Sequence, residues 1–210
     1  AMGEVYLGRD PGLKRTVAVK RAHAQMAYDP IALQRFLNEA QVTAQLDHPA
    51  IVPVYGLERD DHGNFTYAMK FVRGVTLSQF LDETRRQIEE RGAADEGHSL
   101  RQRLEAFVPV MNAIAYAHRR GVVHRDLKPD NIMIGSFGQV LVMDWGIARI
   151  LGRGDPDATS PPVEGAAPSA LSTSPKLTLA GSILGTPAYM SPEQAAGQEV
   201  GPSSDQYTLG

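Results

Sequence analysis

The chain has 210 residues, 42% of them hydrophobic, which is enough for one large or two small packed units. A formal net charge of −3 at pH 7 gives no reason to expect a nucleic-acid partner. The absence of cysteine excludes disulfides and thiol catalysis, and a cytoplasmic location fits that composition. No apolar run approaches the roughly 20 residues of a membrane-spanning helix. Neither end reads as a natural terminus, so we expect a fragment.

The first third of the chain predicts strands around one helix. Residues 3–8 and 16–20 read as two strands joined by a turn. Asp29 followed by Pro30 predicts the start of a helix. Its apolar positions have helical spacing, and they are Leu33, Phe36, Leu37, Ala40 and Ala44. A further strand begins near residue 51, and another covers residues 65–72.

The pattern becomes helical from Val75 onward. Residues 83–98 are highly charged and predict a solvated helix end and loop. Ser99 and Gln102 have the spacing of a capping box, which predicts a second long helix ending before Gly121. Pro109 should kink or interrupt that helix. The apolar stripe that we expect to face the core is Leu104, Phe107, Val108, Met111, Ile114 and Ala115.

The stretch His-Arg-Asp-Leu-Lys-Pro-Asp-Asn at residues 124–131 carries the groups that phosphoryl transfer needs. Asp126 is an acid that can accept a hydroxyl proton. Lys128 is a cation for the moving phosphate, and Asn131 offers an amide oxygen to Mg²⁺. One short match can arise by chance, so its partners elsewhere in the chain decide the interpretation.

Five partner motifs occur in the right order. A strand reading Val-Ala-Val-Lys ends at Lys20, and Glu39 lies on the flank of the first helix. Taken alone, each of these two charges is usually a solvated surface group. Asp144 opens Asp-Trp-Gly after a buried strand, residues 185–193 read Gly-Thr-Pro-Ala-Tyr-Met-Ser-Pro-Glu, and Asp205 opens the last helix. Asp205 should hold the backbone of the loop at residues 124–131.

These motifs together resemble a Hanks-type (eukaryotic-like) bacterial serine/threonine protein kinase catalytic domain, in the variant with Asp-Trp-Gly in place of Asp-Phe-Gly, truncated at both ends. The resemblance implies an α+β, bilobal protein-kinase-like fold with an antiparallel β N-lobe and a mainly α, incomplete C-lobe. We place the N-lobe and hinge at residues 1–72. The partial C-lobe follows at residues 73–210, with a long activation segment at about residues 144–193.

The resemblance also implies the cofactors ATP and Mg²⁺, with Mn²⁺ as an alternative to Mg²⁺. The residues implied for catalysis are Asp126, Lys128, Lys20, Glu39 and Thr186. The implied metal ligands are Asn131 and Asp144. The implied nucleotide contacts are Gly3, Val5, Ala18, Lys20, Met69, Lys70, Phe71, Val72, Met133 and Asp144. Gly3 would be the last glycine of a glycine-rich loop whose first two glycines are absent from this chain.

Regulation by phosphorylation is a further expectation. Arg125 precedes Asp126, the arrangement in kinases that are switched by phosphorylation of the activation segment. Residues 152–176 are rich in Pro, Ser, Ala and Gly and predict a disordered insertion. Thr178 and Ser182 are our candidate phosphorylation sites.

The implied activity is transfer of the ATP γ-phosphoryl group to Ser or Thr of protein substrates. Two alternatives are a pseudokinase acting as an ATP-binding regulatory module and a small-molecule phosphotransferase. Lys128-Pro129 and residues 185–193 argue against the second alternative. No nucleic acid is expected as a partner, and a dimer for trans-autophosphorylation stays open. The domain would be cytoplasmic, by itself or as the cytoplasmic part of a longer membrane-anchored protein.

Overall fold

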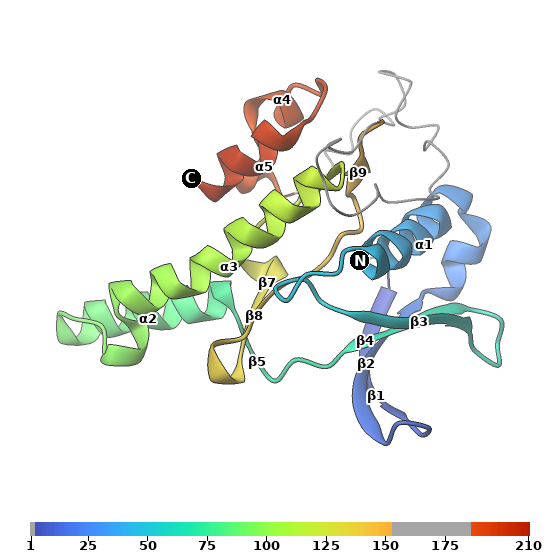
Figure 1. The fold of residues 1–210 in the computed structure, drawn as a ribbon, viewed down its shortest axis with the longest axis horizontal. Coiled ribbons are helices and arrows are strands. Elements are labelled where there is room, and N and C mark those ends of the chain that lie inside the picture. Colours follow the sequence, from blue (N-terminus) through green and yellow to red (C-terminus); the bar gives the residue numbers. More distant parts are fainter. Residues whose placement is uncertain (1–2, 153–185) are drawn as a thin grey trace.

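The computed structural model describes residues 3–152 and 186–210. They form a strand-rich part and a mainly helical part that lie beside each other (Figure 1). This is the two-lobed α+β architecture that the sequence predicts. The predicted insertion at residues 152–176 lies almost wholly outside the described residues, and so do Thr178 and Ser182.

The strand-rich part is a four-stranded antiparallel sheet with strand order β1-β2-β4-β3. Its strands are β1 (Gly3–Asp10), β2 (Arg15–Ala22), β3 (Val54–Arg59) and β4 (Phe65–Lys70). Lys20 of β2 is opposite both Val5 of β1 and Tyr67 of β4. Directly opposite residues in neighbouring strands point to the same face. These three side chains therefore share one face of the sheet.

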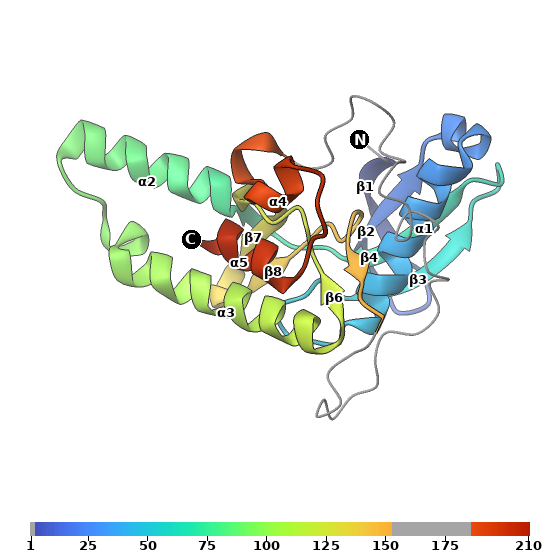
Figure 2. The same cartoon turned by 90° about the horizontal axis from the view of Figure 1, so that it is seen from above.

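One long helix, α1 (Pro30–Gln45), follows the short 3-10 helix η1 (Ala24–Tyr28) and lies against the sheet (Figures 1 and 2). The Asp29 side chain accepts hydrogen bonds from the backbone of Ile31 and Ala32, as the sequence predicts for its N-cap. The buried side of α1 consists of Phe36, Glu39, Ala40, Val42 and Thr43. Ala44, which we expected on that side, is exposed, because the helix turns its Val42 and Thr43 inward instead.

Two long helices, α2 (Leu77–Arg91) and α3 (Leu100–Arg119), extend away from the sheet and are joined at their far end by η2 (Glu96–His98) (Figure 2). Thr76 and Gln79 form a capping box at the start of α2. Gly92 ends α2 with a φ of 76°, a left-handed conformation that glycine adopts without a steric penalty. The charged stretch that we predicted as a solvated helix end is therefore mostly the outer part of α2.

The sequence-based prediction for α3 is wrong in two respects. The helix continues through Pro109 without interruption. Its buried residues are Ala106, Val110, Ala113, Ile114 and Ala117, whereas Leu104, Val108, Met111 and Ala115 of the predicted core stripe are exposed. The buried side of α3 combines three alanines with Val110 and Ile114, and α3 contacts β6, β8 and α5.

Short strands precede and follow the loop at residues 124–131. One sheet has the order β5-β7-β8 and a second pairs β6 with β9. Their bounds are β5 (Gly74–Thr76), β6 (Val122–Val123), β7 (Ile132–Gly135), β8 (Val140–Val142) and β9 (Arg149–Ile150). The remaining elements are η3 (Pro129–Asn131), η4 (Ser136–Gly138), η5 (Pro187–Tyr189), α4 (Pro192–Ala195) and α5 (Pro202–Leu209). The loop at residues 124–131 thus runs from β6 into β7.

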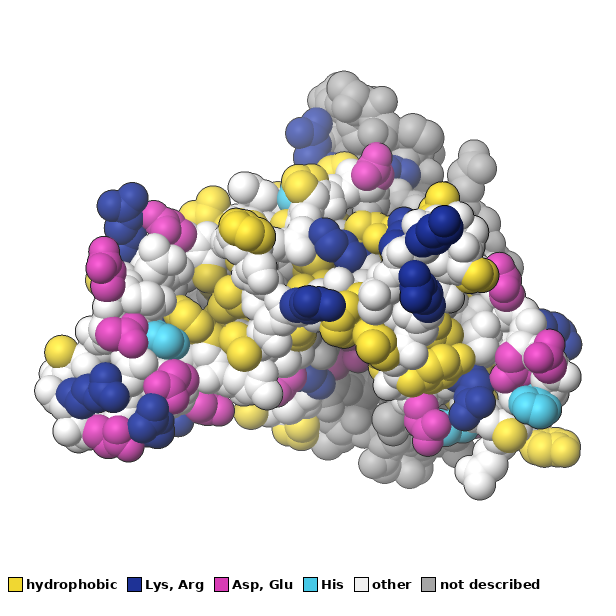
Figure 3. Space-filling view, turned by 90° about the horizontal axis from the view of Figure 1, so that it is seen from below, with side chains coloured by type: hydrophobic (Ala, Val, Ile, Leu, Met, Phe, Trp, Pro, Cys, Tyr) yellow, Lys and Arg dark blue, Asp and Glu magenta, His cyan; other side chains and the backbone are white. Residues whose placement is uncertain are grey.

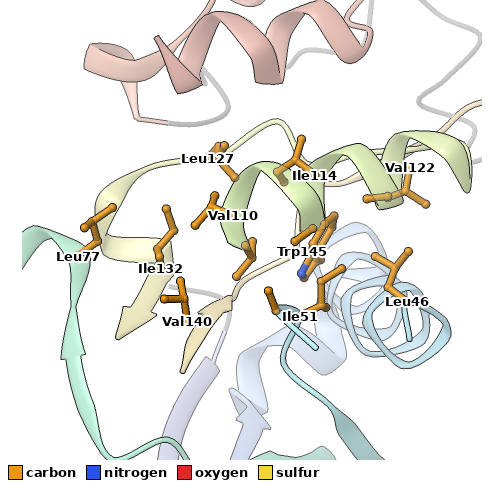
Figure 4. Close-up of a cluster of buried hydrophobic side chains, with 14 of the residues drawn as sticks. Leu46, Ile51, Leu77, Val110, Ile114, Val122, Leu127, Ile132, Val140 and Trp145 are labelled. Atoms are coloured by element: carbon orange, nitrogen blue, oxygen red, sulfur yellow. The ribbon is translucent and has the colours of Figure 1, made fainter. Parts of the chain in front are cut away.

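The larger of two hydrophobic clusters connects the two parts of the molecule (Figure 4). Trp145, 1% exposed, lies among Leu46 and Ile51 from the segment that ends α1 and Ile114 from α3. The backbone of β8 also pairs with residues 50–52 through two hydrogen bonds. The end of α1 therefore packs into the helical part, and the loop that holds Trp145 cannot move independently of it.

The surface is charged at its ends and more apolar between them. Figure 3 shows hydrophobic side chains across the middle of one face with several basic side chains among them, whereas acidic side chains lie mostly towards both sides. Several charges on α2 pair with one another, as Arg86 does with Glu83 and Glu90. Within residues 3–152 and 186–210, no helix has the length and apolar character needed to cross a membrane.

Candidate active site

A cavity of about 140 Å³ lies between the four-stranded sheet, α1 and the segment after β8. Five residues that the sequence assigns to the site line it, namely Val5, Lys20, Glu39, Met69 and Asp144. The other lining residues were not predicted, and they are Thr43, Val52, Val54, Tyr67 and Met143. The fold therefore brings together side chains that are up to 139 positions apart in the sequence.

The sheet register accounts for the N-terminal side of this cavity. Ala18 and Lys20 point to the same face of β2, since strand side chains alternate, and Ala18 is opposite Met69. Gly3 lies further along β1, opposite Ala22. A Cβ atom on Gly3 would lie 2.4 Å from the carbonyl oxygen of Arg21, so the close approach of β1 to β2 requires glycine there.

Lys20 and Glu39 form a buried ion pair. Lys20 Nζ donates to Glu39 Oε1 at 2.5 Å, and the two side chains are 12% and 3% exposed. Burial raises the pKa of Glu39, and the nearby Asp144 carboxylate adds to this, while Lys20 and Tyr67 oppose it. The hydrogen bonds from Lys20 and Tyr67 thus favour the charged form of this carboxylate, against the effect of its burial.

Asp126 is surrounded by the residues that the sequence places around it. Lys128 Nζ lies 2.9 Å from Asp126 Oδ2 and donates to Thr186 Oγ1 at 2.7 Å. The backbone N–H of Thr186 donates to Asp126 Oδ1 at 3.2 Å. Asn131 Nδ2 donates to the Asp126 carbonyl oxygen at 2.8 Å. A residue 60 positions downstream therefore completes the constellation at residues 126–131.

The backbone of the loop at residues 124–131 is held by the buried carboxylate of Asp205. Asp205, 1% exposed, accepts hydrogen bonds from the backbone N–H of His124 at 2.8 Å and of Arg125 at 2.9 Å. His118 Nε2 lies 2.7 Å from the same carboxylate. Arg125 has a φ of 72°, which is unusual for a residue other than glycine, and its carbonyl oxygen accepts from Gln194 Nε2. The loop is thus fixed in a conformation that it would not prefer alone.

Asp144 reaches the cavity from a second constrained segment. Its φ is 58°, and its carboxylate is exposed towards solvent. On one side Met143 N–H donates to the Asn131 carbonyl oxygen at 2.8 Å. On the other side Trp145 is buried with its ring 4.6 Å from that of His124. Trp145 and His124 thus pack against each other between the loop at residues 124–131 and Asp144.

Other predicted nucleotide contacts lie beside the cavity but do not line it. Lys70 ends β4 and its backbone N–H donates to the Pro53 carbonyl oxygen, and half-buried Phe71 and Val72 follow it. Met133 of β7 is half-buried and paired with Thr76 of β5. Nucleotide contacts by Lys70, Phe71, Val72 and Met133 therefore stay a prediction.

Two arginines near Arg125 were not recognised in the sequence. The pKa of Arg125 is lowered, first by burial and then by the like charges of Arg149 and Arg35, with Asp205 opposing the shift. The Nε atoms of Arg125 and Arg149 are buried and have no hydrogen-bond partner within the described part of the chain. Arg35 comes from α1 and Arg149 from β9, so no local motif could have linked them. Three positive charges thus gather beside the catalytic loop.

The donor set fits Mg²⁺ bound together with a phosphate-bearing nucleotide. Because Asn131 Nδ2 donates to Asp126, its amide oxygen is the atom that can face a cation, and Asp144 adds a carboxylate. Such oxygen ligands suit Mg²⁺, which usually takes one or two from the protein and others from phosphates and water. In the described ranges no three His, Asp or Glu side chains gather as a complete metal site.

Lys20 and Asp144 line the cavity, and a hydrogen bond from Met143 to the Asn131 carbonyl oxygen joins its wall to the loop that holds Asp126. A lysine, two aspartates and an asparagine are the groups that phosphoryl transfer uses. The family model described as protein kinase domain matches residues 1–210. The chain belongs to the protein kinase family.

Relatives with curated names are bacterial kinases. The chain is 41% identical over 212 residues to serine/threonine-protein kinase PknD of Protochlamydia amoebophila, covering all of this chain and 21% of that protein. It is 37% identical over 213 residues to PknD of Chlamydia pneumoniae, with coverage of 100% and 22%. It is 40% identical over 212 residues to a probable serine/threonine-protein kinase of Streptomyces coelicolor, with coverage of 100% and 27%. The chain thus spans about a fifth to a quarter of the length of these relatives.

Proposed function

We propose that the chain is the catalytic part of a serine/threonine protein kinase, which transfers the γ-phosphoryl group of ATP to Ser or Thr of protein substrates. The observation that carries this proposal is the contact of Thr186 with both Asp126 and Lys128. It joins the downstream segment, which would seat a peptide hydroxyl, to the acid that would receive its proton. The kinase names of the relatives support the same substrate class.

Each site residue then has a defined task. The substrate hydroxyl oxygen attacks the γ-phosphorus, its proton passes to Asp126, and the bond to the β,γ-bridging oxygen breaks as ADP leaves. Lys128 neutralises charge on the moving phosphoryl group, and Lys20, aimed by Glu39, contacts the other phosphates. Mg²⁺, when bound by Asn131 and Asp144, neutralises phosphate charge. Catalysis in such a site comes from positioning and electrostatics.

Autophosphorylation with radiolabelled ATP and Mg²⁺ tests this proposal in the full-length protein. We expect label on Ser or Thr in the wild type and a loss of about 10²–10⁴-fold in Asp126→Asn. Asp130→Asn is the matched control, because Asp130 is an exposed acid in the same loop. A folded wild type that binds ATP but labels neither itself nor a generic protein would contradict the proposal. That outcome would favour an ATP-binding pseudokinase or a small-molecule phosphotransferase.

We also infer that phosphorylation of the segment between Asp144 and Thr186 regulates activity. Arg35 and Arg149 place like charges near Arg125, and the Nε atoms of Arg125 and Arg149 have no hydrogen-bond partner within the described residues, although Arg149 pairs with Glu199. A phosphate carries about −1.5 to −2 charge at pH 7 and would pair with such a cluster. Because Arg35 lies on α1 together with Glu39, this pairing would hold the helix where Glu39 meets Lys20.

The regulatory inference predicts that phosphatase treatment lowers the activity of the wild type and that re-phosphorylation restores it. In Arg35→Ala, phosphorylation should no longer raise the activity, while the unphosphorylated rate stays near that of the wild type. Arg59→Ala, which removes an arginine that stacks on Phe65 and does not belong to the cluster, should respond as the wild type does. An Arg35→Ala protein that is still fully activated would refute the role of the cluster.

Partners and location follow from the proposed reaction. The substrates would be proteins with Ser or Thr acceptors, and a transient dimer would allow one copy to phosphorylate another. Because ATP and Mg²⁺ are cytoplasmic substrates, the domain would work on that side of any membrane to which a longer protein is anchored.

A further inference from the structure

The Lys20–Glu39 ion pair has a third member, the hydroxyl group of Tyr67. Tyr67 Oη donates to Glu39 Oε1 at 2.6 Å, and Lys20 Nζ donates to the same oxygen at 2.5 Å. Tyr67 is 4% exposed and Glu39 is 2% exposed. Glu39 Oε2 is also buried and has no hydrogen-bond partner within residues 3–152 and 186–210. Two donors, from two neighbouring strands, therefore act on a single carboxylate oxygen.

Tyr67 is held in place by the sheet and by α1. It is directly opposite Lys20 in the register of β2 and β4. Its ring centroid lies 5.3 Å from that of Phe36, which is fully buried on α1. Phe36 and Glu39 are three residues apart and therefore lie on one side of the helix. Tyr67 thus touches the helix at two points, through an apolar ring contact at Phe36 and a hydrogen bond at Glu39.

The hydroxyl group matters because Glu39 is buried. Burial is the first cause that raises the pKa of Glu39, and the charge of Asp144 raises it as well. The charge of Lys20 and the hydrogen bonds from Lys20 and Tyr67 oppose this rise without cancelling it. A protonated Glu39 would not hold the Lys20 ammonium group as an ion pair. The pKa of Tyr67 is itself raised, by burial and by the Glu39 charge, so its hydroxyl stays protonated and can donate. The bond from Tyr67 therefore favours the charged carboxylate.

We propose that Tyr67 is a positioning residue for phosphoryl transfer, which holds the charged Glu39 carboxylate in place and so sets where Lys20 presents its ammonium group to the nucleotide. This inference deepens the proposed kinase function and rests on it. It assigns a separate task to each half of the side chain. The ring packs α1 against the sheet, and the hydroxyl aligns the ion pair.

The variant Tyr67→Phe separates these two tasks, because it keeps the ring and removes only the hydroxyl. In the full-length protein we expect kcat/KM for ATP to fall by about tenfold to a hundredfold, the effect of losing a hydrogen bond to a charged group. Tyr55→Phe is the matched control, since Tyr55 is 40% exposed on β3 of the same sheet and stacks with Arg15. Its kcat/KM should stay within twofold of the wild type. An equally small change in Tyr67→Phe would overturn the proposal.

The pH profile distinguishes positioning from packing. Removing the hydroxyl should raise the pKa of Glu39 further, so Glu39 stays protonated up to a higher pH. The acid side of the kcat/KM profile should therefore move to higher pH in Tyr67→Phe and stay unchanged in Tyr55→Phe. If Tyr67→Phe lowered the rate by the same factor at every pH, the hydroxyl would not influence the charge of Glu39 and the proposal would be wrong.

Chemical modification of Glu39 does not require phosphoryl transfer, so it tests the role of Tyr67 independently of the proposed kinase function. A hydrophobic carbodiimide adds to protonated carboxyl groups, and Glu39 lines the cavity through which such a reagent can approach. Peptide mass spectrometry should find Glu39 modified faster, and up to a higher pH, in Tyr67→Phe than in the wild type. Equal modification in both proteins, with an active wild type, would overturn the role of Tyr67 alone. A shifted modification with an inactive wild type would refute the kinase function and support the contact.

Discussion

Asp205 shows, at the scale of a single residue, how one buried carboxylate can organise a catalytic loop. Burial by itself would raise the pKa of Asp205, but hydrogen bonds from His118 and from the backbone N–H groups of Arg125 and His124 hold it below the usual value. The group is therefore charged at neutral pH although it is 1% exposed. The sequence-based prediction that Asp205 holds the loop backbone is confirmed by these contacts.

We predict that Asp205→Asn lowers the free energy of unfolding by about 2–4 kcal/mol at pH 7, because buried donors lose a charged acceptor. A carboxylate with a lowered folded-state pKa stabilises the fold above its unfolded pKa of about 3.9 and loses that effect as the pH falls through the folded value. The difference between the two proteins should therefore stay constant from pH 7 to about pH 5 and shrink below about pH 4.

Urea unfolding, followed by the fluorescence of Trp145, the single tryptophan of these 210 residues, measures this difference. Asp130→Asn is a suitable control, because Asp130 is exposed and its substitution should change stability by about 0.5 kcal/mol or less. A difference for Asp205→Asn that grew as the pH fell from 5 to 3 would contradict the assignment of the charged form.

At the same scale, the sequence predicted the site residues of the loop at residues 124–131 but not the contact of Tyr67 with Glu39. Asp126, Lys128 and Asn131 lie within six positions, and their spacing alone predicts that they act together. Tyr67 lies in an ordinary apolar strand, and nothing near it in sequence indicates that its hydroxyl meets Glu39. Only the pairing of β2 with β4 and the placement of α1 bring these two residues together.

At the scale of the element, α3 shows the limit of hydrophobic periodicity. Its sequence has apolar residues on more than one side, and the stripe that begins at Leu104 was predicted to be the buried side. The fold buries the side that includes Ala106, Ala113 and Ala117, because small residues let the helix approach β6 and α5 closely. The ends of the helix were better predicted, since the Ser99 cap and Gly121 act through local backbone geometry.

Pro109 gives a test at this scale. It lies inside α3, where its missing N–H leaves the Glu105 carbonyl oxygen without its intrahelical donor. We predict that Pro109→Ala raises the free energy of unfolding by about 1–3 kcal/mol, since alanine restores that hydrogen bond and is the best helix former.

The measurement is again urea unfolding, with the exposed neighbour variant Val108→Ala as the control. Val108→Ala should change stability by about 0.5 kcal/mol or less. A destabilised Pro109→Ala protein would show that the proline ring contributes more through its packing than it removes from the helix.

At the scale of the whole molecule, the outward side of α3 forms an exposed apolar stripe. Leu100, Leu104, Val108 and Met111 are 62%, 56%, 48% and 41% exposed and follow one another at intervals of three or four residues. Contiguous apolar surface of this kind favours association in water. Expressed by themselves, the 210 residues should therefore be of low stability and prone to self-association.

We predict that replacing Leu104 and Val108 by glutamate reduces this self-association, because charges on the stripe must be desolvated on contact. Sedimentation velocity over a range of concentrations should show a smaller weight-average size for the double variant. Ile88→Glu, on an exposed position of α2, is the control and should leave the association unchanged. Equal association of all three proteins would show that another surface is responsible.

The sequence by itself determined the family resemblance, the residues of the phosphoryl-transfer motifs, the start of α1 and both ends of α3, whereas it placed the start of α5 at Asp205 and the helix begins at Pro202. These depend on residue type and on spacings of a few positions, which caps, turns and short motifs fix locally. The tertiary structure decided which side of α3 is buried, that Arg35 and Arg149 join Arg125, and that Tyr67 completes the ion pair of Lys20 and Glu39. Each of these depends on which elements pack together, and that choice is made by the burial of the whole core rather than by any one stretch of sequence.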